Sequence, residues 1–256
     1  MPPPLRVLTR GSILVGKHGQ RYVLLDPLVQ RKGKQCNVWS AIKQDNPIHQ
    51  FVLKKPDDED GHGWPDFTQE MEMQKLLYKS GYIRRMVDII PPSSVIGIEP
   101  PIMGLEAFEK SLWTARLRRP FSLGEIRSIM RSIAIGLKQA LTLMDAKYMP
   151  DLKMENILVN GFDNETPGSG EHLVTKIADL GMMRPPSQGP ISAITYRSPE
   201  VYFKKPWTTA TDIWSWGIVT ELDHWVVKLI NKDIRKKILR QSMSPQSCSR
   251  ATAQCT

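Results

Sequence analysis

The stretch Asp151-Leu-Lys-Met-Glu-Asn156, which runs directly into the apolar segment Ile157-Leu-Val159, decides the fold. Three charged side chains and an amide are gathered here, ahead of a short β-prone run. Three more motifs follow in order: Asp179-Leu-Gly181, Ser198-Pro-Glu200 and Asp212-Ile-Trp-Ser-Trp-Gly217. Each string alone arises often by chance, but all four in this order are a specific signal.

Upstream of these motifs the chain is first β-prone and then helical. Short apolar runs alternate with turn residues and predict an antiparallel sheet: Tyr22-Val-Leu-Leu, Asn37-Val-Trp-Ser-Ala, Gln50-Phe-Val-Leu and Ser94-Val-Ile-Gly-Ile. One helix interrupts them, because Asp66 and Gln69 have the spacing of a capping box. A longer helix is predicted over residues 122–147, where Ser122 and Glu125 form a start signal and an apolar stripe follows.

The downstream part contains a hairpin, a last helix and a polar end. A Gly-rich loop over residues 161–170 separates Ile157-Leu-Val from Val174-Thr-Lys-Ile-Ala, which predicts a hairpin. The last helix is predicted to start near Thr209. From about Gln241 the chain lacks an apolar period, which predicts a disordered tail.

In order, the four motifs resemble the catalytic loop, the metal-binding loop, the P-E segment and the following buried helix of the eukaryotic protein-kinase family. The resemblance covers roughly residues 22–225. It implies an α+β bilobal fold, with a small antiparallel β lobe and a truncated, mainly helical lobe. We expect an N-terminal extension over 1–21, the N-lobe over 22–107, the truncated C-lobe over 108–230 and a basic, disordered tail over 231–256.

The resemblance also implies roles for the charged residues. Phosphoryl transfer requires neutralisation of the triphosphate charge and alignment of the attacking hydroxyl. By resemblance, Asp151 orients that hydroxyl and accepts its proton, and Lys153 meets the γ-phosphate. Asn156 and Asp179 are the expected Mg²⁺ ligands, since this ion takes oxygen donors.

Two charges in the N-lobe match the family's phosphate anchor. Lys54 ends the run Phe51-Val-Leu-Lys54, and Glu70 lies on the helix that follows. A lysine on a strand points at phosphates only if a carboxylate on the facing helix holds it. Lys55 and Glu72 are the alternatives, and we favour Lys54 and Glu70.

The remaining nucleotide contacts are also placed by resemblance. The inter-lobe strand and hinge correspond to residues 94–108, with the adenine-contacting backbone at Glu106 and Phe108. Gly33, Val38 and Leu158 are expected to line the ATP site.

The chain departs from the family pattern at three places. Anchoring the phosphate-covering loop on Val38 leaves Arg31 and Cys36 where glycines are usual, and only Gly33 matches. The His-Arg that usually precedes Asp151 is replaced by residues 149–150, which are Met-Pro. Ala193 stands where Ser/Thr kinases generally carry a Thr that braces the catalytic Asp and Lys, and Ser192 or Thr195 would need a backbone shift to replace it.

The carboxyl end is the largest departure. Few residues follow the helix that starts near Thr209, and residues 228–240 have room for one basic helix at most. Glu200 therefore has no obvious partner in the sequence. We expect the apolar faces of the last helix to be partly uncovered, and a partner protein is one way to cover them.

Composition is that of an ordinary globular chain. The 256 residues are 41% hydrophobic and carry a net charge of +9. No run approaches the roughly 18 apolar residues of a membrane span, and no signal peptide is recognisable, so we expect an intracellular protein of the cytoplasm or nucleus without a membrane partner. Two of the three cysteines lie in the last nine residues, which does not fit a disulfide framework or a Cys-based zinc site. From Asp223 onward, seven basic residues oppose two acidic ones, so five of the nine net charges belong to the end of the chain.

The leading hypothesis is an ATP- and Mg²⁺-dependent serine/threonine protein kinase that acts on protein substrates. The alternative is an ATP-binding or inactive pseudokinase that serves as a regulatory or scaffold module, motivated by the degenerate loop, by Ala193 and by the short carboxyl end. A nucleic-acid binder acting through the basic tail is a third hypothesis and ranks last.

Overall fold

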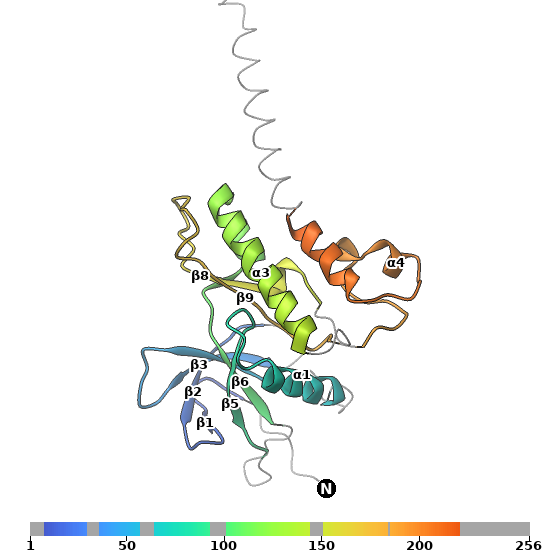
Figure 1. The fold of residues 1–256 in the computed structure, drawn as a ribbon. Helices are drawn as coiled ribbons and strands as arrows, with labels where there is room; N and C mark the ends of the chain where they lie inside the picture. The colour runs from blue at the N-terminus through green and yellow to red at the C-terminus, as the bar shows by residue number, and fades with distance from the viewer. Residues whose placement is uncertain are drawn as a thin grey trace, which may run out of the picture.

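The computed structural model describes residues 8–29, 36–56, 64–92, 101–143, 151–183 and 185–220. These residues form two lobes, a curled antiparallel sheet with one helix and a lobe built around a long helix (Figure 1). The expected α+β bilobal architecture is confirmed. Among the described residues, no helix combines the length and apolar character that crossing a bilayer requires.

The sheet of the first lobe has six strands in the order β1-β2-β3-β4-β6-β5, and every neighbouring pair is antiparallel. The strands are β1 Ile13–Val15, β2 Arg21–Pro27, β3 Val38–Lys43, β4 Gln50–Lys54, β5 Met86–Ile90 and β6 Ile102–Glu106. Three of the expected runs lie in β2, β3 and β4. The fourth, at residues 94–98, lies outside the described residues.

Two strands of this sheet were not predicted from the sequence. β1 lies within the segment expected as an extension, and it pairs with β2 from Ile13 opposite Val23. A strand of three residues is too short to show a period of two, although Leu14 is fully buried. β5 contains Asp88, a buried carboxylate that accepts a 3.1 Å hydrogen bond from the Tyr22 hydroxyl. A charge inside a strand hides its apolar alternation, so this strand was not predicted.

Helix α1, Trp64–Leu76, connects the two hydrophobic cores. Phe67 and Met71 pack on the sheet with Met103, whereas Met73 contributes to the core of the second lobe. The mixed spacing of its apolar residues therefore reflects two different packing partners. The helix begins two residues before the Asp66 start signal, and Asp66 lies in its first turn.

The second lobe is organised by α3, Leu123–Leu143, whose apolar stripe is buried. Beside it lies a three-stranded sheet in the order β7-β8-β9, with α2, Leu112–Arg116, at its start. The strands are β7 Lys110–Ser111, β8 Ile157–Asn160 and β9 Val174–Ile177. β8 and β9 form the expected hairpin. The predicted continuation of α3 to residue 147 lies outside the described residues.

The last two motifs, at residues 198–200 and 212–217, lie at helical segments. A 3₁₀ turn at Ile194–Tyr196 leads into α4, Pro199–Tyr202, and residues 210–220 are helical. The indole nitrogen of Trp216 donates to the Met130 carbonyl of α3 at 3.2 Å. On the same helix Ile213 and Trp214 are exposed, as expected for a partly uncovered face.

Glu200, for which the sequence offered no partner, does have one in the structure. The Thr211 hydroxyl donates to its Oε1 at 3.1 Å. The partner is neutral rather than basic, which explains why a search for opposite charge along the sequence missed it.

A buried ion pair closes the start of α3 onto the 161–170 loop. Both terminal nitrogens of Arg119 donate to the carboxylate of Glu125, at 2.7 and 2.8 Å. The same carboxylate accepts from the backbone N–H groups of Ser122 and Gly168. Burial opposes ionisation of Glu125, but Arg119 and these N–H groups outweigh it and hold the pKa of the carboxyl below its ordinary value.

We predict that Glu125→Ala lowers the free energy of unfolding by about 3–5 kcal/mol, because it leaves the buried Arg119 without its anion. The matched control is Glu72→Ala, which removes an exposed pair with Lys75 and is expected to cost less than about 1 kcal/mol. Urea denaturation of the two variants and the wild type measures both values. Equal losses in the two variants would contradict this role of Glu125.

Candidate active site

Lys54 is held between two carboxylates. It ends β4, and its amine donates to Glu70 of α1 at 2.8 and 2.9 Å and to Oδ1 of Asp179 at 3.2 Å. Glu70 is only 3% exposed. The structure therefore brings together Lys54 and Glu70, the favoured pair, while Glu72 lies at the surface in a pair with Lys75.

The three charged groups shift one another's pKa values. Burial opposes the charge on Lys54, but Glu70 and Asp179 outweigh it and hold the pKa of the amine above its ordinary value. Burial dominates at Glu70 and raises the pKa of that carboxyl despite Lys54. At Asp179 burial acts in the same direction, but Lys54 outweighs it and the pKa of the carboxyl lies below its ordinary value. Asp179 is thus the carboxylate best suited to stay ionised.

The backbone of Asp179 is unusual for a residue with a side chain. Its φ is +60°, in the left-handed region that costs a non-glycine residue about 1–3 kcal/mol. The Gly181 N–H donates to its carboxylate. Together with Lys54, this contact favours the strained conformation, which directs the carboxylate to the pocket between the lobes.

The opening motif forms a compact turn below Asp179. The Lys153 amine donates to Oδ2 of Asp151 at 2.9 Å, and the amide nitrogen of Asn156 donates to the Asp151 carbonyl at 3.0 Å. The 3₁₀ turn Met154–Asn156 leads directly into β8. The Tyr196 hydroxyl accepts from the Met154 N–H at 3.3 Å, so the segment after residue 190 supports the turn.

Asp151 is buried, and its Oδ1 has no hydrogen-bond partner in the described part of the chain. Behind it lies Asp212, whose Oδ2 is likewise without a partner there. Burial, and secondly the charge of Asp151, hold the pKa of Asp212 well above its ordinary value. The unpaired oxygen of Asp151 is itself buried, and the other oxygen accepts from the Lys153 amine.

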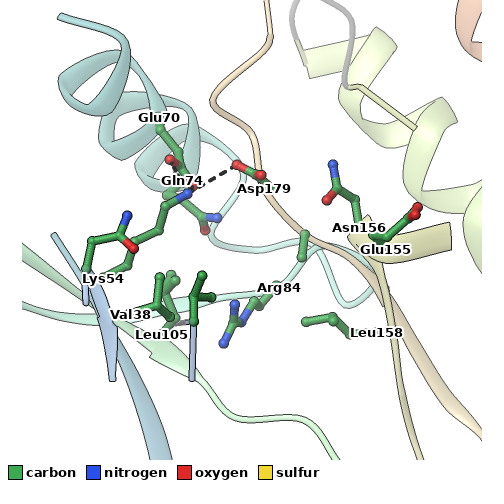
Figure 2. Close-up of a pocket in the computed structure, with 13 residues that line it drawn as sticks. Val38, Lys54, Glu70, Gln74, Arg84, Leu105, Glu155, Asn156, Leu158 and Asp179 are labelled. Carbon is green, nitrogen blue, oxygen red and sulfur yellow. Dashed lines mark hydrogen bonds and ion pairs between the residues drawn. The ribbon is translucent and has the colours of Figure 1, made fainter. Parts of the chain in front are cut away.

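A pocket of about 450 Å³ lies between the lobes. Its wall contains six of the residues expected at the site: Val38, Lys54, Glu70, Asn156, Leu158 and Asp179. Figure 2 shows Glu70 and Asp179 beside the Lys54 amine, with Val38, Leu105 and Leu158 farther along the pocket and Arg84 between Leu105 and Leu158. Asp151 and Lys153 do not line it. Gly33, the sixth expected nucleotide contact, lies outside the described residues, as do Arg31 and Lys32.

Four polar residues of the wall were not predicted: Asn37, Gln74, Arg84 and Glu155. Gln74 follows Glu70 by one helical turn, so helical spacing was a usable signal. Arg84 has no such signal, because it stands between α1 and β5 without a recognisable motif. Burial lowers the pKa of Arg84 to about 10, against the opposing effect of Glu70, Glu106 and Asp179, so the guanidinium is charged at neutral pH.

Glu106 and Phe108 are not brought to this pocket, contrary to the sequence-based expectation. Both line a second pocket, of about 490 Å³. The side chain of Glu106 pairs there with Lys176 at 2.7 Å and with Arg85 at 3.4 Å. Its backbone carbonyl accepts from Nε of Arg84 at 2.7 Å, and its N–H donates to the Arg85 carbonyl. Leu105, the residue before Glu106 on β6, lines the first pocket instead.

Neither substitute for the missing Thr at position 193 reaches the catalytic turn. Ser192 has φ +60°, and its carbonyl accepts from Arg197. Thr195 is exposed. Asp151 and Lys153 instead pair directly with each other.

Asn156 and Asp179 fit a hard cation. Both line the pocket, and the Asp179 side chain is 47% exposed. Because the amide nitrogen of Asn156 is engaged with Asp151, its oxygen is available as a ligand. A carboxylate and an amide oxygen are donors that Mg²⁺ accepts. Within the described residues there is no cluster of three His, Cys, Asp or Glu side chains that could hold a metal ion.

Comparison with known proteins agrees with the sequence motifs. A sequence model described as a protein kinase domain matches residues 32–249. Fibroblast growth factor receptor 1 of Dugesia japonica is 26% identical over 187 residues, which are 68% of this chain and 21% of that protein. Ephrin type-A receptor 4-A of Xenopus laevis is 31% identical over 160 residues, 55% of this chain and 15% of that protein.

The matches also show how much of the relatives this chain covers and where the domain match ends. The chain spans about a fifth or less of the length of the curated relatives it matches. The domain match ends at residue 249, beyond the end near residue 225 that the motifs suggested.

We predict that Lys54→Met lowers the free energy of unfolding by about 2–3 kcal/mol at pH 7, because it leaves the buried Glu70 charged and unpaired. The loss should shrink at pH 5. Glu70 already has a raised pKa in the folded protein and would have a higher one without Lys54, so protonation on acidification removes the unpaired charge and favours the folded state of the variant.

The matched control for this experiment is Lys138→Met, at an exposed position of α3 that does not line the pocket. Urea denaturation of both variants and the wild type at the two pH values measures the effect. A loss for Lys54→Met that equals the control, or that does not decrease at pH 5, would argue against the ion pair as described.

Proposed function

The chain belongs to the protein kinase family, and from this premise we propose that it transfers the γ-phosphate of Mg²⁺-bound ATP, or of another purine nucleoside triphosphate in the same pocket, to serine or threonine hydroxyls of protein substrates. The observation that carries the proposal is the arrangement of Lys54, Glu70 and Asp179 around one amine at the mouth of the pocket. An amine in this position neutralises phosphate charge, and Glu70 keeps it in place.

The remaining chemistry follows from the residues beside the pocket. Asn156 and Asp179 would hold the Mg²⁺ ion, which supplies neutralisation of the triphosphate charge when bound. Asp151 orients the acceptor hydroxyl and takes its proton, the role that the family resemblance gives it. By the same resemblance Lys153, which is paired with Asp151, meets the γ-phosphate.

Serine or threonine as the acceptor is supported by residues 196–201, Tyr-Arg-Ser-Pro-Glu-Val, which resemble the branch of cyclin-dependent and SR-protein kinases. Protein substrates follow from the family. We propose an intracellular location and, for the exposed Ile213 and Trp214, coverage by a partner protein.

A nucleotide-binding module without turnover is the second candidate. One observation favours it: in the described part of the chain neither Ser192 nor Thr195 takes the place of the missing Thr beside Asp151, which pairs with Lys153 instead. The two candidates differ in turnover and share nucleotide binding.

We predict that Asp151→Asn lowers phosphate incorporation by about 100-fold or more, because the amide cannot accept the proton of the hydroxyl. The assay uses purified full chain with millimolar Mg²⁺ and either ATP or GTP, a mixed Ser/Thr/Tyr acceptor, and identification of the phosphorylated residue type. Asp45→Asn, at an exposed loop position away from the pocket, is the matched control and should retain the wild-type rate.

Three outcomes separate the candidates. Loss of turnover in Asp151→Asn alone supports the kinase. Equal incorporation by wild type and Asp151→Asn contradicts it, and nucleotide binding without any incorporation supports the non-catalytic module. Phosphotyrosine as the sole product would overturn the proposed Ser/Thr specificity.

A further inference from the structure

The position of Arg84 is set by its backbone. Its N–H donates to the Ile177 carbonyl of β9 at 2.7 Å, and the Ile177 N–H donates to the Tyr82 carbonyl at 2.9 Å. Arg84 is therefore anchored at the junction of the two lobes. Its side chain enters the wall of the interlobe pocket, where Figure 2 shows it between Leu105 and Leu158.

The guanidinium has a fixed part and a free part. Nε donates to the Glu106 carbonyl at 2.7 Å. For the two terminal nitrogens, the described part of the chain supplies no hydrogen-bond acceptor. Anionic Glu70 and Asp179 are near enough to act on Arg84 electrostatically, but both are already paired with Lys54. The end of Arg84 is thus a charged donor group that faces the pocket with its hydrogen bonds unmade.

The surroundings of Arg84 suit a flat ring. Val38 comes from β3 of the first lobe and Leu158 from β8 of the second lobe, and Leu105 also lines the pocket. The phosphate-binding charges lie at the other end of the same pocket, as Figure 2 shows. A nucleotide whose phosphates meet Lys54 would place its base among these apolar side chains, next to the free end of Arg84.

At this end the pocket offers hydrogen-bond donors, whereas the 6-amino group of an amino-purine needs an acceptor. Nε of Arg84 is held by the Glu106 carbonyl, and the terminal N–H groups remain as donors in the wall of the pocket. N–H donors repel an amino group and bind a carbonyl. Guanine presents O6 and N7 as adjacent acceptors that match the fork of an arginine, whereas adenine presents an amino group beside N7.

We propose that Arg84 makes the pocket selective for purine nucleotides that carry a 6-carbonyl group, so that guanine nucleotides bind in preference to adenine nucleotides. This inference rests on the proposed function, because it assumes that the pocket holds a nucleoside triphosphate. It identifies Arg84 as the residue that determines base specificity.

The test compares the affinities of the full chain for Mg²⁺ complexes of GTP, ITP and ATP, by calorimetry under one set of conditions. We expect GTP to bind about tenfold more tightly than ATP, within the range of a two-point arginine contact to a purine. ITP has the 6-carbonyl but lacks the 2-amino group, so it should bind like GTP. Arg84→Val should abolish this preference, and Arg84→Lys should retain part of it.

Arg85→Val is the matched control, since Arg85 is the adjacent arginine and lines the second pocket instead. It should keep the wild-type ranking of the three nucleotides. ATP binding as tightly as GTP, or ITP behaving like ATP, overturns the inference and leaves the proposed function intact. Absence of binding for all three nucleotides overturns both. The ranking in the wild type decides the matter even if Arg84→Val does not fold.

Discussion

One amine on a sheet strand, Lys54, lies between carboxylates that come from two distant parts of the chain. Glu70 belongs to α1, and Asp179 lies in the loop that follows β9. A buried charge that loses its partner costs several kcal/mol, so the elements that carry these groups are stable only when they meet. The ion pair thereby couples the sheet, its helix and the second lobe, and the pocket opens at the place where the three converge.

Apolar packing places the groups of this ion pair. α1 contributes Phe67 and Met71 to the core beneath the sheet and Met73 to the core of the second lobe. A helix anchored on both sides has little freedom to rotate, and Glu70 is therefore presented to Lys54 while Glu72, two residues on, faces solvent. Position along the helix, rather than charge, distinguishes the two carboxylates.

Arg84 shows how one residue changes the wall of the pocket. The Ile177 N–H donates to the Tyr82 carbonyl and the Arg84 N–H donates to the Ile177 carbonyl, so Arg84 is fixed at the junction of the two lobes, where its Nε donates to the Glu106 carbonyl. Its side chain thereby lies in the pocket wall between Leu105 and Leu158. At the other end of the pocket, Lys54 retains both of its carboxylates.

The sequence by itself determined the family and the two-lobe architecture, because short polar motifs and the strand that carries Lys54 are local patterns. From the same patterns it predicted Lys54, Glu70 and Asp179, which the structure brings together. It missed β1, which is too short for a period, and β5, where buried Asp88 breaks one. Only the tertiary structure decided the end of the pocket where Arg84 lies. Which face of β6 meets the pocket depends on strand pairing, and the neighbour of the Glu106 carbonyl comes from 22 residues away. Contacts of this kind leave no spacing or periodicity in the chain, and they arise only when the lobes pack together.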